Sequence, residues 1–115
     1  MKVLVCGGRD YEDESAIQKA LNERHRVISF THLIHGDCSG ADRIAAEWAR
    51  VHGVQPVACE ALWNFGKSAG PIRNRRMLEL SPDLVIAFPG GIGTADMMRQ
   101  AREANIDVWQ PTSQV

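Results

Sequence analysis

The stretch "DLVIAFPGGIGTADM", residues 83–97, joins an apolar run to a glycine-rich turn and then to a segment with helical spacing. Residues 83–88 form the most apolar run of the chain and predict a buried strand near the centre of a sheet. Residues 93–105 predict a helix that turns Met97 and Ala101 inward. A strand that passes through bare glycines into a helix is the repeating unit of parallel α/β sheets.

The rest of the chain alternates short apolar runs with segments of helical periodicity. The other predicted strands are residues 2–6, 32–35, 54–59 and 106–110, and the other predicted helices are residues 13–25, 40–53 and 71–80. Pro56 lacks a backbone N–H, so residues 54–59 are expected at an edge of the sheet. The pattern predicts one domain, residues 1–115, with a doubly wound parallel sheet of about five strands and helices on both faces. This is a three-layer α/β fold.

Composition narrows the classes of function. The net charge of -1 disfavours nucleic acid as a partner, because that binding needs a surplus of Lys and Arg on one face. No apolar run approaches the roughly 18 residues of a membrane span, and the apolar start is too short for a signal peptide, so a cytoplasmic protein without membrane contact is expected. The chain has 3 cysteines without a CxxC spacing, which predicts reduced thiols and no metal site.

Glycine, hydroxyl and charged residues cluster just after the predicted strands. "GGRDY" follows the first strand, "HGDCSGAD" closes the second, a loop with Trp63 follows the third, and "PGGIGT" follows the fourth. The carboxyl ends of parallel strands meet at one edge of the sheet, where such folds bind their ligands. The sequence therefore predicts one site at this edge.

Glycine turns that open helices can bind phosphate, because no Cβ keeps the ligand from the backbone and the free N–H groups favour an anion. We expect phosphate on the last turn, the first turn as the neighbouring wall, and a ribose or second phosphate on the second turn. The candidate ligand-binding residues of these turns are Gly7, Gly8, Arg9, Gly36, Ser39, Gly40, Asp42, Pro89, Gly90, Gly91, Gly93 and Thr94. Neither the GxGxxG dinucleotide fingerprint nor the GxxxxGK[ST] loop occurs.

The segment "AGPIRNRRM" brings two more candidates. A helix that starts at Pro71 places Arg73 and Asn74 in its first turn, near the same edge. Arginine can hold a phosphate with two N–H groups, and asparagine can pair with a base, a ribose or a loop. A cation in a first turn opposes the helix dipole, which favours a functional reason for Arg73.

These motifs, in this order and over nearly the full length, resemble the YspA-like, cpYpsA-related branch of the SLOG superfamily. The resemblance implies a Rossmann-like fold that recognises a nucleotide or nucleotide-derived ligand, such as an ADP-ribose-like molecule, in a sensor or processor. It also implies a homo-oligomer. Trp63 is a candidate to stack on a base. DprA is another SLOG relative, but the charge and the few aromatic residues disfavour DNA binding here.

Two alternatives stay open. The Lonely Guy phosphoribohydrolases, also SLOG proteins, carry a motif similar to PGGxGTxxE, in which the glutamate position is Met97 here. Hydrolysis of an N-glycosidic bond needs a carboxylate, for which Asp10, Asp42 and Asp96 are the candidates. Asp10 and Asp42 could equally cap the helices that follow them. The other alternative is an oligomeric interaction module without a ligand, to which Trp48 and Trp109 could contribute.

Overall fold

The computed structural model describes residues 1–61, 66 and 68–112. Within them the chain alternates strands and helices in the predicted order. The elements are β1 (Lys2–Cys6), α1 (Glu14–Val27), β2 (His32–His35), α2 (Ala41–Val51), β3 (Gln55–Ala58), α3 (Ala69–Leu78), β4 (Leu84–Ala87), α4 (Ile92–Glu103) and β5 (Asp107–Trp109). Trp63 lies outside the described residues.

The five strands form one parallel sheet in the order β3-β2-β1-β4-β5. The predicted parallel α/β fold is therefore confirmed. β3, with Pro56, lies at an edge as expected. β4 is an interior strand, but β1 rather than β4 occupies the middle of the sheet. The chain order reverses between β1 and β4, so the turns after these two strands flank the point where doubly wound sheets open to ligands.

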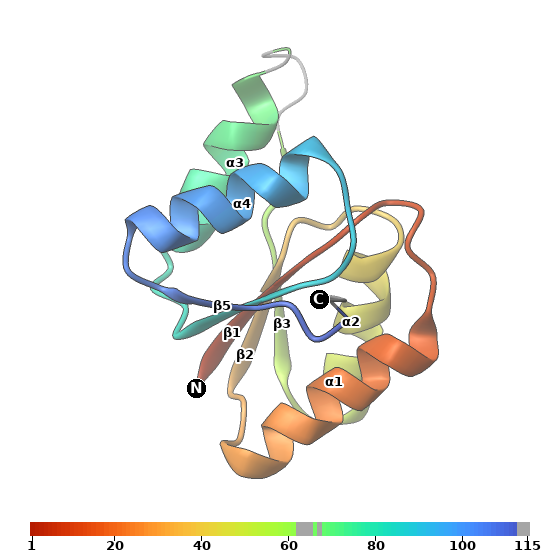
Figure 1. The fold of residues 1–115 in the computed structure, drawn as a ribbon. Helices are drawn as coiled ribbons and strands as arrows, with labels where there is room; N and C mark the ends of the chain where they lie inside the picture. Colours follow the sequence, from red (N-terminus) through yellow and green to blue (C-terminus); the bar gives the residue numbers. More distant parts are fainter. Residues whose placement is uncertain (62–65, 67, 113–115) are drawn as a thin grey trace.

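Helices cover both faces of the sheet, with α1 and α2 on one side and α3 and α4 on the other (Figure 1). Side chains of a strand point to alternate faces, so each strand feeds both hydrophobic layers. Val3 and Val5 of β1 belong to the layer under α1 and α2. Leu4 of β1 packs instead with Met77 of α3 and Met97 of α4. The two layers hold both helix pairs against one sheet.

Two helices begin earlier than predicted. α3 begins at Ala69, so Pro71 is its third residue rather than its first. Proline is tolerated there, because N–H groups of the first turn have no partner within the helix. Arg73 and Asn74 consequently lie in the second turn, where the predicted conflict with the helix dipole does not arise. α4 begins at Ile92, which places Asp96 beyond the first turn.

The tryptophans considered for an interface belong to the core layer. Trp48 is 4% exposed, and its indole Nε1 donates to Asn22 Oδ1 at 2.9 Å. Trp109 packs half-buried against the same layer. In the described part of the chain, no helix is long and apolar enough to cross a membrane.

Candidate functional site

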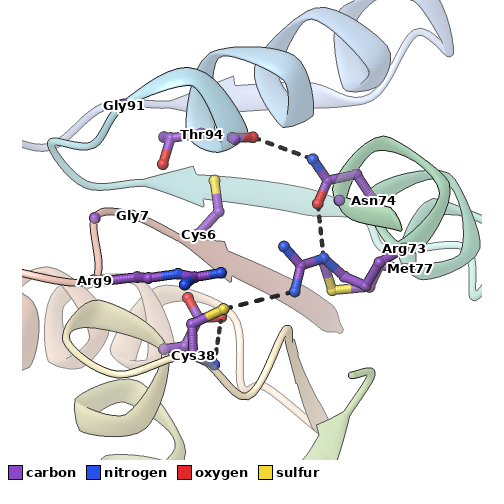
Figure 2. Close-up of a pocket in the computed structure, with 13 residues that line it drawn as sticks. Cys6, Gly7, Arg9, Cys38, Arg73, Asn74, Met77, Gly91 and Thr94 are labelled. Atoms are coloured by element: carbon purple, nitrogen blue, oxygen red, sulfur yellow. Dashed lines mark hydrogen bonds between the residues drawn. The ribbon is translucent and has the colours of Figure 1, made fainter. Parts of the chain in front are cut away.

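A cavity of about 290 Å³ opens at the carboxyl edge of the sheet, between the turns that follow β1, β2 and β4. In Figure 2, Arg9 extends from the β1 turn toward Arg73 of α3. Most of the sequence-predicted residues line this cavity: Gly7, Gly8, Arg9, Asp42, Arg73, Asn74, Gly91, Gly93 and Thr94. Side chains far apart in the sequence thus meet at the predicted edge.

The glycine turn before α4 leaves its backbone open to the cavity. Gly91 is the N-cap of α4, and no side chain of the described residues caps this helix end. A Cβ at Gly91 or Gly93 would have no atom of the described residues within 4 Å, and neither has a positive φ. Packing therefore does not require glycine at these two positions, and neither residue lies in the left-handed region. Thr94, the third residue of the helix, is buried beside them.

At other glycines of the predicted site, neighbouring atoms of the protein leave no room for a Cβ. A Cβ at Gly7 would lie 2.6 Å from Ala41 Cβ, and one at Gly8 would lie 3.0 Å from the Pro89 carbonyl oxygen. Gly8 N donates to that oxygen at 2.8 Å, which joins the β1 and β4 turns. A Cβ at Gly90 would lie 2.7 Å from Gly8 N and would collide with Thr94 Oγ1.

Carbonyl groups of the β1 turn pack against the turn before α2. Gly40 has a φ of +74°, and a Cβ there would collide with the carbonyl oxygens of Gly8 and Arg9. Ser39 Oγ donates to the Arg9 carbonyl at 3.2 Å, and Ala41 N donates to the Gly8 carbonyl at 3.3 Å. Ser39, Gly40, Gly36, Pro89 and Gly90 thus support the cavity from behind and do not line it.

Arg73 is a buried cation at the cavity wall, only 9% exposed. Its Nε donates to Asn74 Oδ1 at 3.0 Å, and its Nη1 donates to the Gly36 carbonyl at 3.1 Å and to Cys38 Sγ at 3.7 Å. Nη2 has no hydrogen-bond partner among the described residues, and the atom is not fully buried. Figure 2 shows the guanidinium directed into the cavity. One face of this cation is therefore available to an anion.

Asp42 is the carboxylate of the cavity wall, 6% exposed at the start of α2. Its Oδ2 accepts from Gly36 N at 2.8 Å and from Cys38 N at 3.5 Å, so it braces the turn before α2. Burial raises the pKa of Asp42 to about 6, against the lowering effect of these N–H groups and of Arg73. This carboxyl can exchange a proton near neutral pH.

The other candidate carboxylates lie away from the cavity lining. Asp10 is exposed and does not cap α1, since that role belongs to Asp13. Asp96 is hydrogen-bonded to Asn74, Arg99 and Gln100. Met97, at the glutamate position of the Lonely Guy motif, is 0% exposed in the hydrophobic layer. Asp42 is thus the one of the three candidates that reaches the cavity.

Four lining residues were not predicted: Cys6, Cys38, Gly70 and Met77. Gly70 and Met77 stand three residues before and four residues after Arg73, which is the spacing of one helix face and the signal that could have found them. Burial raises the pKa of the Cys6 thiol to about 12, so it stays neutral. Over the described ranges, no group of three or more His, Cys, Asp or Glu side chains is arranged to hold a metal.

Comparisons with known proteins identify relatives of this chain. A family model described as the YspA, cpYpsA-related SLOG family matches residues 1–66. Gene 61 protein of Mycobacterium phage D29 is 39% identical over 116 residues, covering 93% of each chain.

Two solved structures share the fold at 20% identity. DNA processing protein A (DprA) from Streptococcus pneumoniae superposes with a TM-score of 0.76 over 93% of this chain. The match covers 48% of the DprA chain, so the present chain spans about half of that protein. A protein called TM1055 gives a TM-score of 0.69 over 94% of this chain and 72% of its own.

Proposed function

Because the chain belongs to the YspA, cpYpsA-related SLOG family, we propose that it binds a nucleotide or nucleotide-derived ligand at the carboxyl edge of the sheet. The phosphate would lie on the glycine turn before α4. Arg9 and Arg73 would face it from the other walls of the cavity.

One observation carries this proposal: Gly91 and Gly93 are bare without a reason in the protein's own packing. Gly93 lies in the first turn of α4, where glycine costs roughly 0.5–1 kcal/mol of stability relative to alanine, whereas glycine is an ordinary N-cap at position 91. A ligand that touches the backbone supplies the missing reason, because a Cβ at either position would stand in the cavity. The uncapped N–H groups and the positive end of the α4 dipole favour an anion there.

The charges of the cavity fit a phosphate. The hydrogen bonds of Arg73 within the described residues use Nε and Nη1, which leaves Nη2 as the N–H group that could donate to a phosphate. The volume of about 290 Å³ lies just below the usual range of ligand pockets, about 300–1,000 Å³. It suits the phosphate and sugar of a nucleotide, with the base nearer the rim.

The direct test is thermal unfolding with AMP, ADP, ATP, ADP-ribose, NAD, cyclic nucleotides and inorganic phosphate. A ligand that binds only the folded state stabilises it by about 2.7 kcal/mol at a hundredfold excess over its Kd. We expect a selective rise in Tm that is lost in Arg73→Ala and Gly91→Ala. Arg76→Ala, which removes an exposed cation from the same helix, should respond like the wild type.

Failure to respond would be equally informative. If no compound raises Tm at millimolar concentration, the nucleotide proposal is wrong and an interaction module without a ligand becomes the better interpretation. A rise with every anion, unchanged in Arg73→Ala, would indicate a non-specific charge effect.

The position of Asp42 favours a second candidate, hydrolysis of the N-glycosidic bond of the same ligand. A carboxyl with a pKa of about 6 in a cavity has the proton affinity that general acid–base catalysis uses. The test is release of free base from the ligand that the thermal screen identifies. Asp42→Asn should stop release while binding persists, and absence of release from the wild type would leave a binding protein.

A further inference from the structure

We infer that Asn74, anchored by Asp96, is a positioning residue that aims Arg73 into the cavity, and that it does not itself bind the ligand. This inference rests on the proposed phosphate site and assigns a role to two residues near it. Asn74 is 3% exposed and lies between the cavity and the surface of α4.

The hydrogen bonds of Asn74 leave its amide N–H groups no capacity for a ligand. An asparagine side chain has two N–H donors and one carbonyl acceptor. Nδ2 donates to the Gly93 carbonyl at 3.1 Å and to Asp96 Oδ2 at 3.0 Å. Oδ1 accepts from Arg73 Nε at 3.0 Å. Both N–H donors of the amide are therefore already hydrogen-bonded, and its carbonyl oxygen faces Arg73.

These bonds join the two halves of the proposed phosphate site. The Gly93 carbonyl belongs to the turn that would hold the phosphate, and Arg73 is the cation that would face it. One amide is thus bonded both to the turn and to the guanidinium. A change in its position would move the cation relative to the N–H groups of α4, and phosphate recognition depends on that relative position.

Two groups fix the plane of the guanidinium. Asn74 Oδ1 holds Nε from within α3, and the Gly36 carbonyl holds Nη1 from the turn after β2. With those two positions held, Nη2 remains directed at the cavity, as Figure 2 shows. Without Asn74, a flexible side chain would be held at the Nη1 end alone.

Asp96 anchors the amide from the other side. Its Oδ1 accepts from Arg99 Nη2 at 2.7 Å, and its Oδ2 accepts from Gln100 Nε2 at 2.8 Å as well as from Asn74. Burial would raise the pKa of Asp96, but these hydrogen bonds outweigh burial and lower it. The carboxylate stays charged and determines which side of the Asn74 amide faces Arg73, because it accepts only from N–H groups.

The test combines removal of the amide with an exchange of the two side chains. Asn74→Ala removes all three hydrogen bonds, whereas Asn74→Asp removes both N–H donors and opposes the carboxylate of Asp96. The double variant Asn74→Asp with Asp96→Asn restores the hydrogen bond between positions 74 and 96 with donor and acceptor exchanged, but not the donor to the Gly93 carbonyl. Arg75→Gln, an exposed position on the same helix that pairs with Glu79, is the control. Affinity for sulfate and for AMP is measured by calorimetry well below Tm, and the ¹H–¹⁵N signal of Arg73 Nε–H is followed by NMR.

We expect Asn74→Ala and Asn74→Asp to weaken binding of both probes about tenfold, the scale of one hydrogen bond to a charged group. The Arg73 Nε–H of Asn74→Ala should exchange faster with water than in the wild type, because its acceptor is gone. The double variant should regain part of the affinity that Asn74→Asp loses, and Arg75→Gln should change neither property. A role limited to stability would lower Tm without altering affinity or Nε–H exchange.

The outcomes separate this inference from the proposed function. If Asn74→Ala keeps wild-type affinity and Nε–H protection, or the double variant binds no better than Asn74→Asp, the inference is overturned. If the wild type binds no sulfate and no AMP, the phosphate site is wrong. The Nε–H signal would then still show whether Asn74 holds the guanidinium.

Discussion

Gly90, Gly91 and Gly93 belong to one turn but are glycines for different reasons. Gly90 packs against Gly8 N and Thr94, so the fold itself excludes a Cβ there. Gly91 and Gly93 face open space. Substitution to alanine therefore separates a residue that the fold needs from residues that the proposed ligand needs.

Gly93→Ala should stabilise the empty protein by about 0.4–1 kcal/mol, because alanine loses less backbone entropy on folding and fits a helical position. The same Cβ would stand in the cavity and weaken nucleotide binding. The measurement is urea unfolding together with the thermal screen. Gly90→Ala is the matched control, expected to lose about 1–3 kcal/mol through overpacking. Loss of stability in Gly93→Ala would show that the turn, not a ligand, requires this glycine.

Asp42 makes stability depend on pH. Burial raises its pKa from 3.8 to about 6, so the folded protein holds a proton that the unfolded chain has released. This stabilisation is complete below about pH 4 and is lost as pH rises through about 6. Asp42→Asn should therefore be more stable than the wild type at neutral pH, by up to about 3 kcal/mol, with the difference shrinking toward about pH 4. Urea titrations across this range test it, and parallel pH curves would contradict it.

At the level of the elements, the helices differ in how their first N–H groups are satisfied. α1 has a side-chain cap, since Asp13 Oδ1 accepts from Ala16 N at 3.1 Å. α2 begins at Gly40, whose turn is filled by carbonyls of the β1 turn. α4 begins at Gly91, which faces the cavity. Of these three helix ends, the one with neither arrangement is the one proposed to hold phosphate.

Asp13→Ala should destabilise the protein by about 1 kcal/mol, the usual cost of losing an N-cap. Asp10→Ala should change the free energy of unfolding by less than about 0.5 kcal/mol, because Asp10 is exposed and caps no helix. Denaturant midpoints of the two variants give the comparison. Equal losses would mean that the α1 cap contributes nothing.

The elements also show what the sequence could predict. Residues 2–6 and 32–35 were predicted to the residue, because apolar runs that end in glycine mark buried strands clearly. The start of α3 was missed because Pro71 is allowed at more than one position of a first turn. The position of the cavity at the carboxyl edge of the sheet could be predicted from the topology. The contact between Gly36 and Arg73 could not, because these residues are 37 apart in the sequence and no local pattern indicates that they meet.

At the scale of the whole molecule, the end of β1, the start of α2 and the turn after β4 pack closely together, which limits the size of the residues between them. Gly7 lies where they meet, and Phe88 and Ala41 leave no room for a Cβ. Gly7→Ala should therefore cost about 1–3 kcal/mol through overpacking. The urea m-value should stay unchanged, since the surface exposed on unfolding is the same. Wild-type stability would show that these elements can separate at little cost.

The two edge strands of the sheet, β3 and β5, limit how copies of this chain can assemble. Gln55 N donates to the Thr31 carbonyl just before β2, and Cys59 N donates to the His35 carbonyl of β2. The alternation of the strand therefore turns the nitrogen of Pro56 outward. An incoming strand would find no donor at that position, and the opposite end offers only the three residues of β5. Polymerisation by continuation of the sheet is thus disfavoured at both ends. We therefore expect a homo-oligomer of this protein to form through surfaces other than the edges of its sheet.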